Sequence, residues 1–277
     1  MCRWFDSNCR YLSNVEVNVV DVRFPKLVSS RSQDLFTVVH LPSIEDLSFP
    51  FVVMCHGLGG SKVGRFRYPV HLSELLAEQG IATIRFDFRG SGDSEGYFSD
   101  TTLERCTEDL EAVINWAGEQ SAFDTSRIGL FGRSFGGVIA LLYAAKNGRT
   151  VSAVGVQSPP FSFDLYSDKL PSHMWFERET LFFHGEPLSQ AFIDQMDSLN
   201  MSEVMKRLHQ TPLLHIGGGK DAVVPAEHTK AYENARAGAQ APTQFVTLPN
   251  ADHALSNISD RQTALKETCD LFISRLL

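Results

Sequence analysis

The sequence predicts an α/β fold with a mostly parallel sheet of eight strands and helices on both of its faces. From residue 51 onward, short apolar runs rich in β-branched residues alternate with segments of helical period. Most of these runs are apolar at nearly every position, as in strands that are buried on both faces of a sheet. With 277 residues, of which 43% are hydrophobic, the chain is large enough to bury such a core. We therefore expect a single domain over residues 1–277.

The first two predicted strands differ from the rest. The run "VEVNVVDVRF" (15–24) largely alternates apolar with polar residues, and "DLFTVVHL" (34–41) is a second run rich in strand formers. A polar stretch separates the two runs. We expect an antiparallel hairpin here, at one edge of the sheet.

The remaining strands and helices follow in alternation. The clearest helix lies near 102–119, where apolar residues recur every three or four positions and form one stripe for burial. Strands are expected at 51–55, 81–87, 127–132, 151–157, 212–218 and 243–249, and the other helices near 69–79, 135–147, 225–237 and 259–276.

The alternation is interrupted at about residues 159–208, a segment that we call the insertion. It shows no sustained period, contains many aromatic residues, and is too long for a simple connection. We expect it to carry short elements of its own. Its aromatic side chains together suit the lining of an apolar pocket, although most of them are expected to belong to the insertion's own core. The candidates for contact with a ligand are Phe161, Tyr166, Trp175 and Phe182.

Composition excludes several classes of function. The formal net charge is −8 and no cluster of Lys and Arg is present, so we expect no nucleic-acid partner. No apolar stretch approaches the roughly 18 residues that cross a membrane, and the N-terminal residues contain no signal-like apolar run. The five cysteines include no CxxC pair, which indicates neither a disulfide framework nor a metal site. A cytoplasmic location is expected.

The motif Gly132-Arg133-Ser134-Phe135-Gly136 matches G-x-S-x-G and lies between a predicted strand and a predicted helix. A sharp strand-to-helix turn holds its central residue in a strained backbone conformation. It also brings the two glycines close to neighbouring backbone, where a Cβ would collide. Ser134 is therefore predicted to project at the carboxyl end of the sheet as a nucleophile.

A serine nucleophile needs a general base, and the base needs an acid that holds its tautomer. In the chain order that accompanies this motif, the acid and then the histidine follow the serine. Asp221 follows the predicted strand at 212–218 and His253 follows the one at 243–249. Ser134, Asp221 and His253 are therefore the candidate catalytic residues.

Two backbone N–H groups are needed to stabilise the oxyanion that forms when a serine attacks a carbonyl carbon. The residue after the nucleophile, Phe135, supplies the first. The second is expected from the segment "HGLGG" (56–60), which follows the strand that ends at Cys55. Its glycines allow the backbone to approach a substrate, and Leu58 is the predicted donor.

Other carboxylates fit the catalytic acid less well. Asp87, Asp93 and Asp100 precede Ser134, which is the wrong chain order. We interpret Asp87, together with Arg89, as organising its loop through hydrogen bonds.

Three histidines outside the candidate triad are not interpreted as catalytic. His56 is expected to contact backbone near the predicted oxyanion loop. His215 lies within a predicted strand, which indicates a core residue with its hydrogen bonds satisfied. His228 lies on a predicted helix and is expected to be solvated.

The segments "HGLGG", "IRFDFRGSGDSEG", "GRSFGG", "GGGKDAVVP" and "NADH" occur in this order, and together they resemble an α/β-hydrolase. The resemblance is strongest to small serine esterases similar to cinnamoyl (feruloyl) esterases, monoacylglycerol lipases and serine aminopeptidase-like hydrolases. It implies hydrolysis of a carboxylic ester through an acyl-enzyme, with the insertion as a lid. Arg133 stands where such enzymes often carry His. Lys220 stands directly before the candidate catalytic acid, where an acidic or small residue is common in such enzymes.

Two cofactor motifs are rejected. "GGGKD" lacks the first glycine and the Ser or Thr of a phosphate-binding loop, and "GSGDSEG" has Glu95 where a dinucleotide fingerprint needs its third glycine. We expect no cofactor, no metal and a small-molecule ester as substrate. An acyltransferase or peptidase on the same triad, or a non-catalytic scaffold, remain alternatives, and a homodimer is left open.

Overall fold

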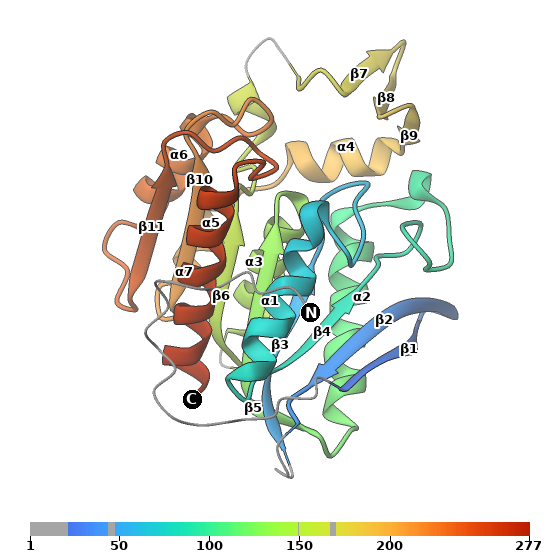
Figure 1. Cartoon of the computed structure of the whole chain (residues 1–277). Helices are drawn as coiled ribbons and strands as arrows, with labels where there is room; N and C mark the ends of the chain where they lie inside the picture. The colour runs from blue at the N-terminus through green and yellow to red at the C-terminus, as the bar shows by residue number, and fades with distance from the viewer. Residues whose placement is uncertain (1–21, 44–47, 149, 167–169) are drawn as a thin grey trace.

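The sheet predicted from the sequence forms the centre of the structure, a computed structural model that describes residues 22–43, 48–148, 150–166 and 170–277 (Figure 1). Its eight strands lie in the order β1-β2-β4-β3-β5-β6-β10-β11. The two edge pairings β1–β2 and β2–β4 are antiparallel and the others are parallel. The strands are β1 (Val22–Ser30), β2 (Gln33–Leu41), β3 (Phe49–Cys55), β4 (Ala82–Phe86), β5 (Phe123–Arg133), β6 (Val151–Gln157), β10 (Leu213–Gly218) and β11 (Thr243–Leu248).

The opening hairpin is present, but its first strand runs later in the chain than predicted. β1 extends to Ser30 and pairs in register with β2, from Val22 opposite Leu41 to Ser30 opposite Gln33. The tight turn uses Arg31 and Ser32, both with positive φ, and neither is a residue type that marks such a turn in a sequence. Most of the predicted strand at 15–24 lies outside the described residues.

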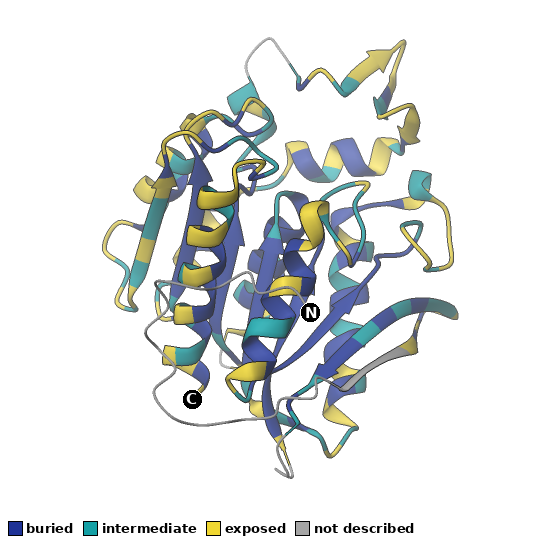
Figure 2. Ribbon diagram, viewed as in Figure 1, coloured by how far each residue is buried: buried dark blue, intermediate teal, exposed yellow. Residues whose placement is uncertain are grey.

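Helices cover both faces of the sheet, as predicted. α1 (Tyr68–Glu78) and α7 (Ile258–Leu276) pack together on one face over Val52, Met54 and Phe131. The opposite face is covered by α2 (Leu103–Gly118), α3 (Phe135–Asn147) and α6 (Ala226–Arg236). Figure 2 shows the result: the central strands are buried along their length, whereas the helices alternate buried and exposed stripes.

Helix starts follow local capping signals in the sequence. The hydroxyl of Thr102 accepts a hydrogen bond from the N–H of Arg105 at the start of α2. The side-chain oxygen of Asn257 accepts from the N–H groups of Ser259 and Asp260 at the start of α7. Such caps satisfy backbone donors that have no partner within the helix, which explains why these boundaries could be predicted closely.

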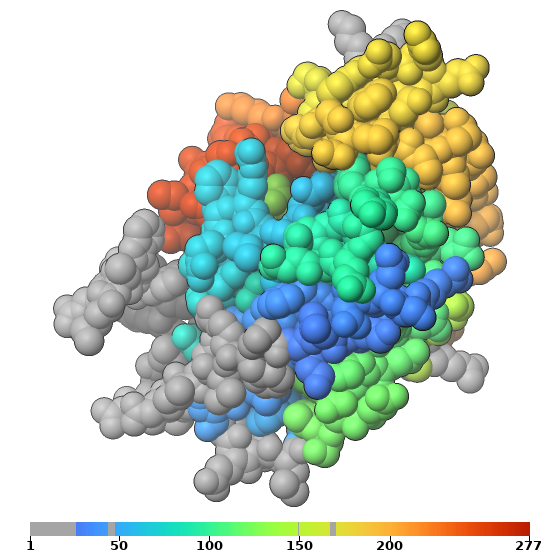
Figure 3. Space-filling model, turned by 90° about the vertical axis from the view of Figure 1, so that its right-hand side faces the viewer, coloured from blue at the N-terminus to red at the C-terminus, as the bar shows by residue number. Residues whose placement is uncertain are grey.

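The insertion carries short elements, as expected. They lie above the carboxyl ends of the central strands in Figure 1 and form the yellow cap at the top of Figure 3. A small antiparallel sheet is followed by two short helices that lead back to β10. The elements are β7 (Met174–Glu177), β8 (Thr180–Phe183), β9 (Glu186–Leu188), α4 (Gln190–Asp197) and α5 (Met201–Arg207).

Candidate active site

The sharp turn between β5 and α3 places Ser134 at the carboxyl end of the sheet. Ser134 has φ 52° and ψ −126°, an uncommon backbone conformation for a residue with a side chain. A Cβ on Gly132 would lie 2.3 Å from the carbonyl oxygen of Gly136, and one on Gly136 would lie 2.3 Å from the carbonyl oxygen of His56. Both glycines are required by close backbone approach, which is the reason predicted from the motif.

The predicted oxyanion loop follows β3 and is held in place by His56. The N–H of Phe88 donates to Nε2 of His56, so the neutral ring carries its proton on Nδ1, which donates to the carbonyl of Gly57 at 2.8 Å. Burial lowers the pKa of His56 and favours this neutral form. The same carbonyl accepts the N–H of Gly60, which closes a tight turn around Leu58. His56 therefore has a structural position, as expected.

A buried carboxylate anchors the other end of this loop. Asp87 is fully buried and accepts hydrogen bonds from the backbone N–H and the Nζ of Lys62, each at 2.6 Å, and from the N–H of Asp93 at 2.9 Å. Nζ of Lys62 also lies 2.6 Å from a carboxylate oxygen of Asp93. Asp87 thus ties together two loops at the rim of the site, in agreement with the sequence interpretation.

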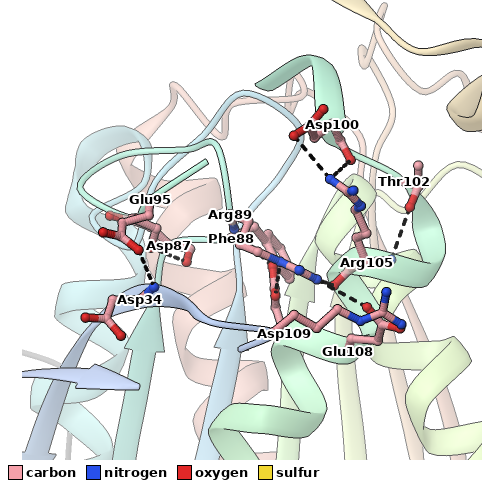
Figure 4. Close-up of polar contacts among 12 residues, drawn as sticks. Asp34, Asp87, Phe88, Arg89, Glu95, Asp100, Thr102, Arg105, Glu108 and Asp109 are labelled. Atoms are coloured by element: carbon pink, nitrogen blue, oxygen red, sulfur yellow. Dashed lines mark hydrogen bonds and ion pairs between the residues drawn. The ribbon is translucent and has the colours of Figure 1, made fainter. Parts of the chain in front are cut away.

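Arg89 fixes the second of these loops to α2 (Figure 4). Its backbone N–H donates to Asp109 at 3.0 Å, and its Nε lies 2.6 Å from the other oxygen of the same carboxylate. The guanidinium also donates to the carbonyl of Arg105 and reaches Glu108. Because Asp109 is buried, this pairing is a rigid attachment rather than a solvated surface contact.

Asp221 and His253 are brought together by the loops after β10 and β11. Nδ1 of His253 lies 2.7 Å from Oδ2 of Asp221. The other oxygen, Oδ1, accepts the backbone N–H groups of Val223 and Val224 at 2.9 and 2.8 Å. The carboxylate is therefore held from both sides, and its orientation selects the His253 tautomer that leaves Nε2 unprotonated.

The backbone carbonyl of His253 is itself held by two strand ends. Nη2 of Arg133 donates to it at 2.7 Å, and Nε2 of Gln157 donates at 3.3 Å. Arg133 and Gln157 face each other at the ends of β5 and β6, and the carbonyl of Gln157 also accepts the N–H of Ser134 at 2.8 Å. The sheet thus connects the serine and the histidine loop directly. Sequence reasoning did not find this link; the only signal was a glutamine that ends the apolar run "VSAVGVQ".

A cavity of about 560 Å³ opens beside these residues. Ser134, His253 and both predicted oxyanion donors, Leu58 and Phe135, line it. Phe135 is the first residue of α3, where backbone N–H groups have no acceptor within the helix. The apolar part of the lining comes mainly from the insertion, including its helix α4. These residues are Phe163, Tyr166, Pro171, Met174, Phe183, Phe192 and Met196.

Of the four aromatic residues proposed for ligand contact, only Tyr166 lies on this cavity. Trp175 and Phe182 are cross-strand partners that stack on each other, and Trp175 is exposed. Phe161 packs edge-on against Tyr232 instead. Side chains alternate along a strand, so the neighbours of Trp175 and Phe182, which are Met174 and Phe183, face the cavity in their place.

Comparison with known proteins identifies the family. The model of the prolyl oligopeptidase family matches residues 67–277, a range that includes Ser134, Asp221 and His253. The chain belongs to the prolyl oligopeptidase family. It is a serine hydrolase with the α/β-hydrolase fold, as its motifs led us to expect.

The individual proteins to which the chain is similar are distant in sequence. The chain is 29% identical over 226 residues to the uncharacterized protein Rv2307c of Mycobacterium tuberculosis, with 82% of this chain and 70% of that protein covered. It is 25% identical to the acylamino-acid-releasing enzyme of Mus musculus, over 79% of this chain and 30% of that enzyme. The structure of Est1E from Butyrivibrio proteoclasticus with bound ferulic acid superposes with a TM-score of 0.78 at 20% identity, covering 90% of this chain and 98% of Est1E.

The surroundings of His228 and His215 differ from those that the sequence predicted. His228 is fully buried rather than solvated: it accepts the N–H of Phe161 through Nδ1 and packs against Tyr166. The helical period placed it on α6 but did not indicate that the insertion covers this face. His215 is buried in β10 as predicted, between Tyr232 and Phe245, but neither ring nitrogen bonds to a described residue.

No helix among the described residues is long and apolar enough to cross a membrane.

Proposed function

We propose that this chain hydrolyses a carboxylic ester with an apolar acyl or aryl group, through an acyl-enzyme formed on Ser134. The observation that carries the proposal is the 2.7 Å contact between His253 and Asp221, in a cavity that Ser134 also lines. With Nδ1 directed to the carboxylate, Nε2 of His253 is the ring nitrogen left to act as a general base.

In this mechanism Nε2 of His253 takes the hydroxyl proton of Ser134 as the oxygen attacks the ester carbonyl. The tetrahedral oxyanion is stabilised by the N–H groups of Leu58 and Phe135, each worth about 10²- to 10³-fold in kcat. The imidazolium then protonates the leaving alcohol. A water molecule activated by the same nitrogen releases the acid and regenerates the serine, so ester and water yield acid and alcohol. The proposed reaction uses no cofactor or metal.

The cavity supports an apolar acyl or aryl group as part of the substrate. Phe163, Phe183 and Phe192 line it together with Met174 and Met196, and a space of about 560 Å³ is in the range of small-molecule sites. The similarity to Est1E, which was solved with ferulic acid, agrees with an aromatic ligand of this size. We propose further that residues 1–277 form one domain in which the insertion acts as a lid.

Peptide or aminoacyl bond cleavage is the second candidate. It is favoured by the family match itself and by the similarity to the acylamino-acid-releasing enzyme. The same nucleophile, base and oxyanion donors serve both reactions, because each proceeds through an acyl-enzyme. The two candidates differ in the leaving group, which is an alcohol in one and an amine in the other.

The test combines active-site labelling with two substrates that differ in the leaving group. Purified protein is expected to react with a fluorophosphonate probe and to hydrolyse 4-nitrophenyl butyrate faster than an N-acetylalanine 4-nitroanilide. Ser134→Ala should abolish labelling and turnover, and Asp221→Asn should lower kcat by about 10³- to 10⁴-fold. Ser121→Ala, which changes an exposed serine in the turn before β5, is the matched control.

Three results would change the proposal. Labelling that persists in Ser134→Ala would exclude this residue as the nucleophile. A preference for the anilide would select the peptidase. A wild-type protein that is folded but neither labelled nor active would favour a non-catalytic scaffold.

A further inference from the structure

The proposed active-site cavity has a positively charged side, although the chain as a whole carries a formal net charge of −8. Arg65, Arg133 and Lys220 line it, and we call these three residues the cationic wall. Lys62 also lines the cavity but is paired with Asp87 and Asp93. The only carboxylate among the described lining residues is Asp252. The charge of the cavity is thus opposite in sign to that of the protein.

The charges of Asp221 and Asp252 act on Arg133. In the described part of the chain, however, no carboxylate lies within ion-pair distance of Arg65, Arg133 or Lys220. The one lining carboxylate, Asp252, is directed to the N–H and hydroxyl of Ser256, at 2.8 and 2.7 Å. The charges on this side of the cavity are therefore available to a bound molecule.

Arg133 gives the strongest support, because its guanidinium is partly removed from solvent. Burial lowers the pKa of its guanidinium, and its Nε is buried without a hydrogen-bond partner among the described residues. Among the described residues, its Nη2 donates a hydrogen bond to the neutral backbone carbonyl of His253. The nearby carboxylate of Asp221 is committed to His253 and to two backbone N–H groups. Arg133 is therefore a partly buried cation that lines the cavity without an ion pair, and such a group can bind the anionic part of a ligand.

Arg65 and Arg133 lie toward one face of the sheet, and the apolar lining lies toward the other. Phe163, Phe183 and Phe192 pack into the core that α2 and α3 cover, on the side of the insertion. Met54 and Phe131, which line the cavity near Arg133, belong to the core beneath α1 and α7. Arg65 directly precedes α1 in the chain, and its charge acts on Arg133. The cavity therefore extends across the carboxyl ends of the central strands, and Ser134, an apolar region and a cationic region all line it.

We propose that this cavity selects esters that carry a free carboxylate, which the cationic wall binds while the apolar part of the substrate lies against the insertion. This inference rests on the proposed ester hydrolysis and specifies its substrate class. The partly buried guanidinium of Arg133 suits a singly charged carboxylate, which can accept two N–H groups of a guanidinium at once. Arg65 and Lys220 are exposed, so solvent and salt screen their attraction, whereas the partly buried Arg133 is screened less.

The experiment compares two esters of matched size, 4-nitrophenyl hemiglutarate with its free carboxylate and neutral 4-nitrophenyl pentanoate. We expect the wild type to have the higher kcat/KM for the acidic ester, and this ratio to fall as salt is raised. Lys220→Gln and Arg65→Gln should each lower the ratio by about three- to tenfold. The ratio cancels any general loss of activity in a variant. Lys220→Arg should retain it, as should the control Lys230→Gln, which neutralises an exposed lysine on α6.

A binding measurement makes the inference independent of turnover. Glutaric acid monoanilide should slow fluorophosphonate labelling of the wild type more than pentananilide does, and Lys220→Gln should reduce this difference. Equal ratios for the two esters, or a ratio that the cationic-wall variants leave unchanged, would overturn the inference. If the wild type prefers a phosphate-bearing ester to the carboxylate-bearing one, the inference that the cationic wall selects a carboxylate would be wrong.

The two proposals fail in different ways. Absence of both labelling and hydrolysis would refute the proposed function. Labelling with hydrolysis of the neutral ester, but without a preference for the acidic one, would refute only the substrate class.

Discussion

Replacing Arg133 by methionine tests whether the sheet positions His253, the proposed catalytic base. Arg133 and Gln157 donate to the same carbonyl, that of His253, at 2.7 and 3.3 Å. The bond from Arg133 is shorter and charge-assisted, a class worth about 1.5–3 kcal/mol, whereas the amide bond from Gln157 is worth about 1 kcal/mol. Arg133→Met should therefore loosen the histidine loop more than Gln157→Leu, while Asp221 continues to hold the imidazole ring.

The expected consequence is a loss in kcat of about 10- to 100-fold for Arg133→Met on the neutral ester, with KM changed little. A displacement of a catalytic group by about 1 Å is sufficient for a loss of this size. Arg133→Lys keeps a donor and a charge and should recover part of the activity. Because both donors act on one carbonyl, the double variant with Gln157→Leu should be less impaired than the two single losses multiplied together.

Steady-state kinetics and thermal unfolding of the wild type and these four variants provide the measurement. The neutral ester is used so that the charge of Arg133 toward a substrate carboxylate does not enter the comparison. A kcat within twofold of the wild type in Arg133→Met, with Tm lowered, would show that the contact only stabilises the fold and would refute the positioning role. Independent, multiplicative losses in the double variant would show that the two donors do not share a target.

Two further predictions concern stability. Gly136→Ala should destabilise the fold by about 1–3 kcal/mol, because the new Cβ would lie 2.4 Å from the carbonyl oxygen of Cys55. Chemical denaturation should show a lower midpoint with an unchanged slope. Unchanged stability would show that the turn around Ser134 can relax to accept a side chain. Burial of His228 lowers its pKa to about 4, below its ordinary value of 6.5, so the unfolded chain binds a proton first as the pH falls. Its contribution to the free energy of unfolding is present above pH 6.5 and should decline by about 2–3 kcal/mol between pH 6.5 and 4, an effect that His228→Asn should remove from a stability–pH profile.

The elements of the fold were predictable because they depend on local patterns. The buried stripe of α2 and the apolar run "VSAVGVQ" of β6 were placed within a residue or two of their observed ends. β1 was misplaced because the turn at Arg31 and Ser32 contains neither glycine nor asparagine, so no local signal marked it. The aromatic residues of the insertion could be recognised as a group, but their strand register could not be predicted. A shift of one residue along a strand turns each side chain to the other face of the sheet.

The sequence by itself determined the chemistry that is proposed: the elbow around Ser134, the order of Asp221 and His253 after it, and an apolar segment for the insertion. These features are local, since a strained turn needs glycine and each acid or base must follow a strand end. Only the tertiary structure decided the surroundings of these residues. The bonds from Arg133 and Gln157 to His253, the burial of His228 and the gathering of Arg65, Arg133 and Lys220 on one cavity join segments far apart in the chain. Packing of the sheet, and no pattern along the sequence, brings them together.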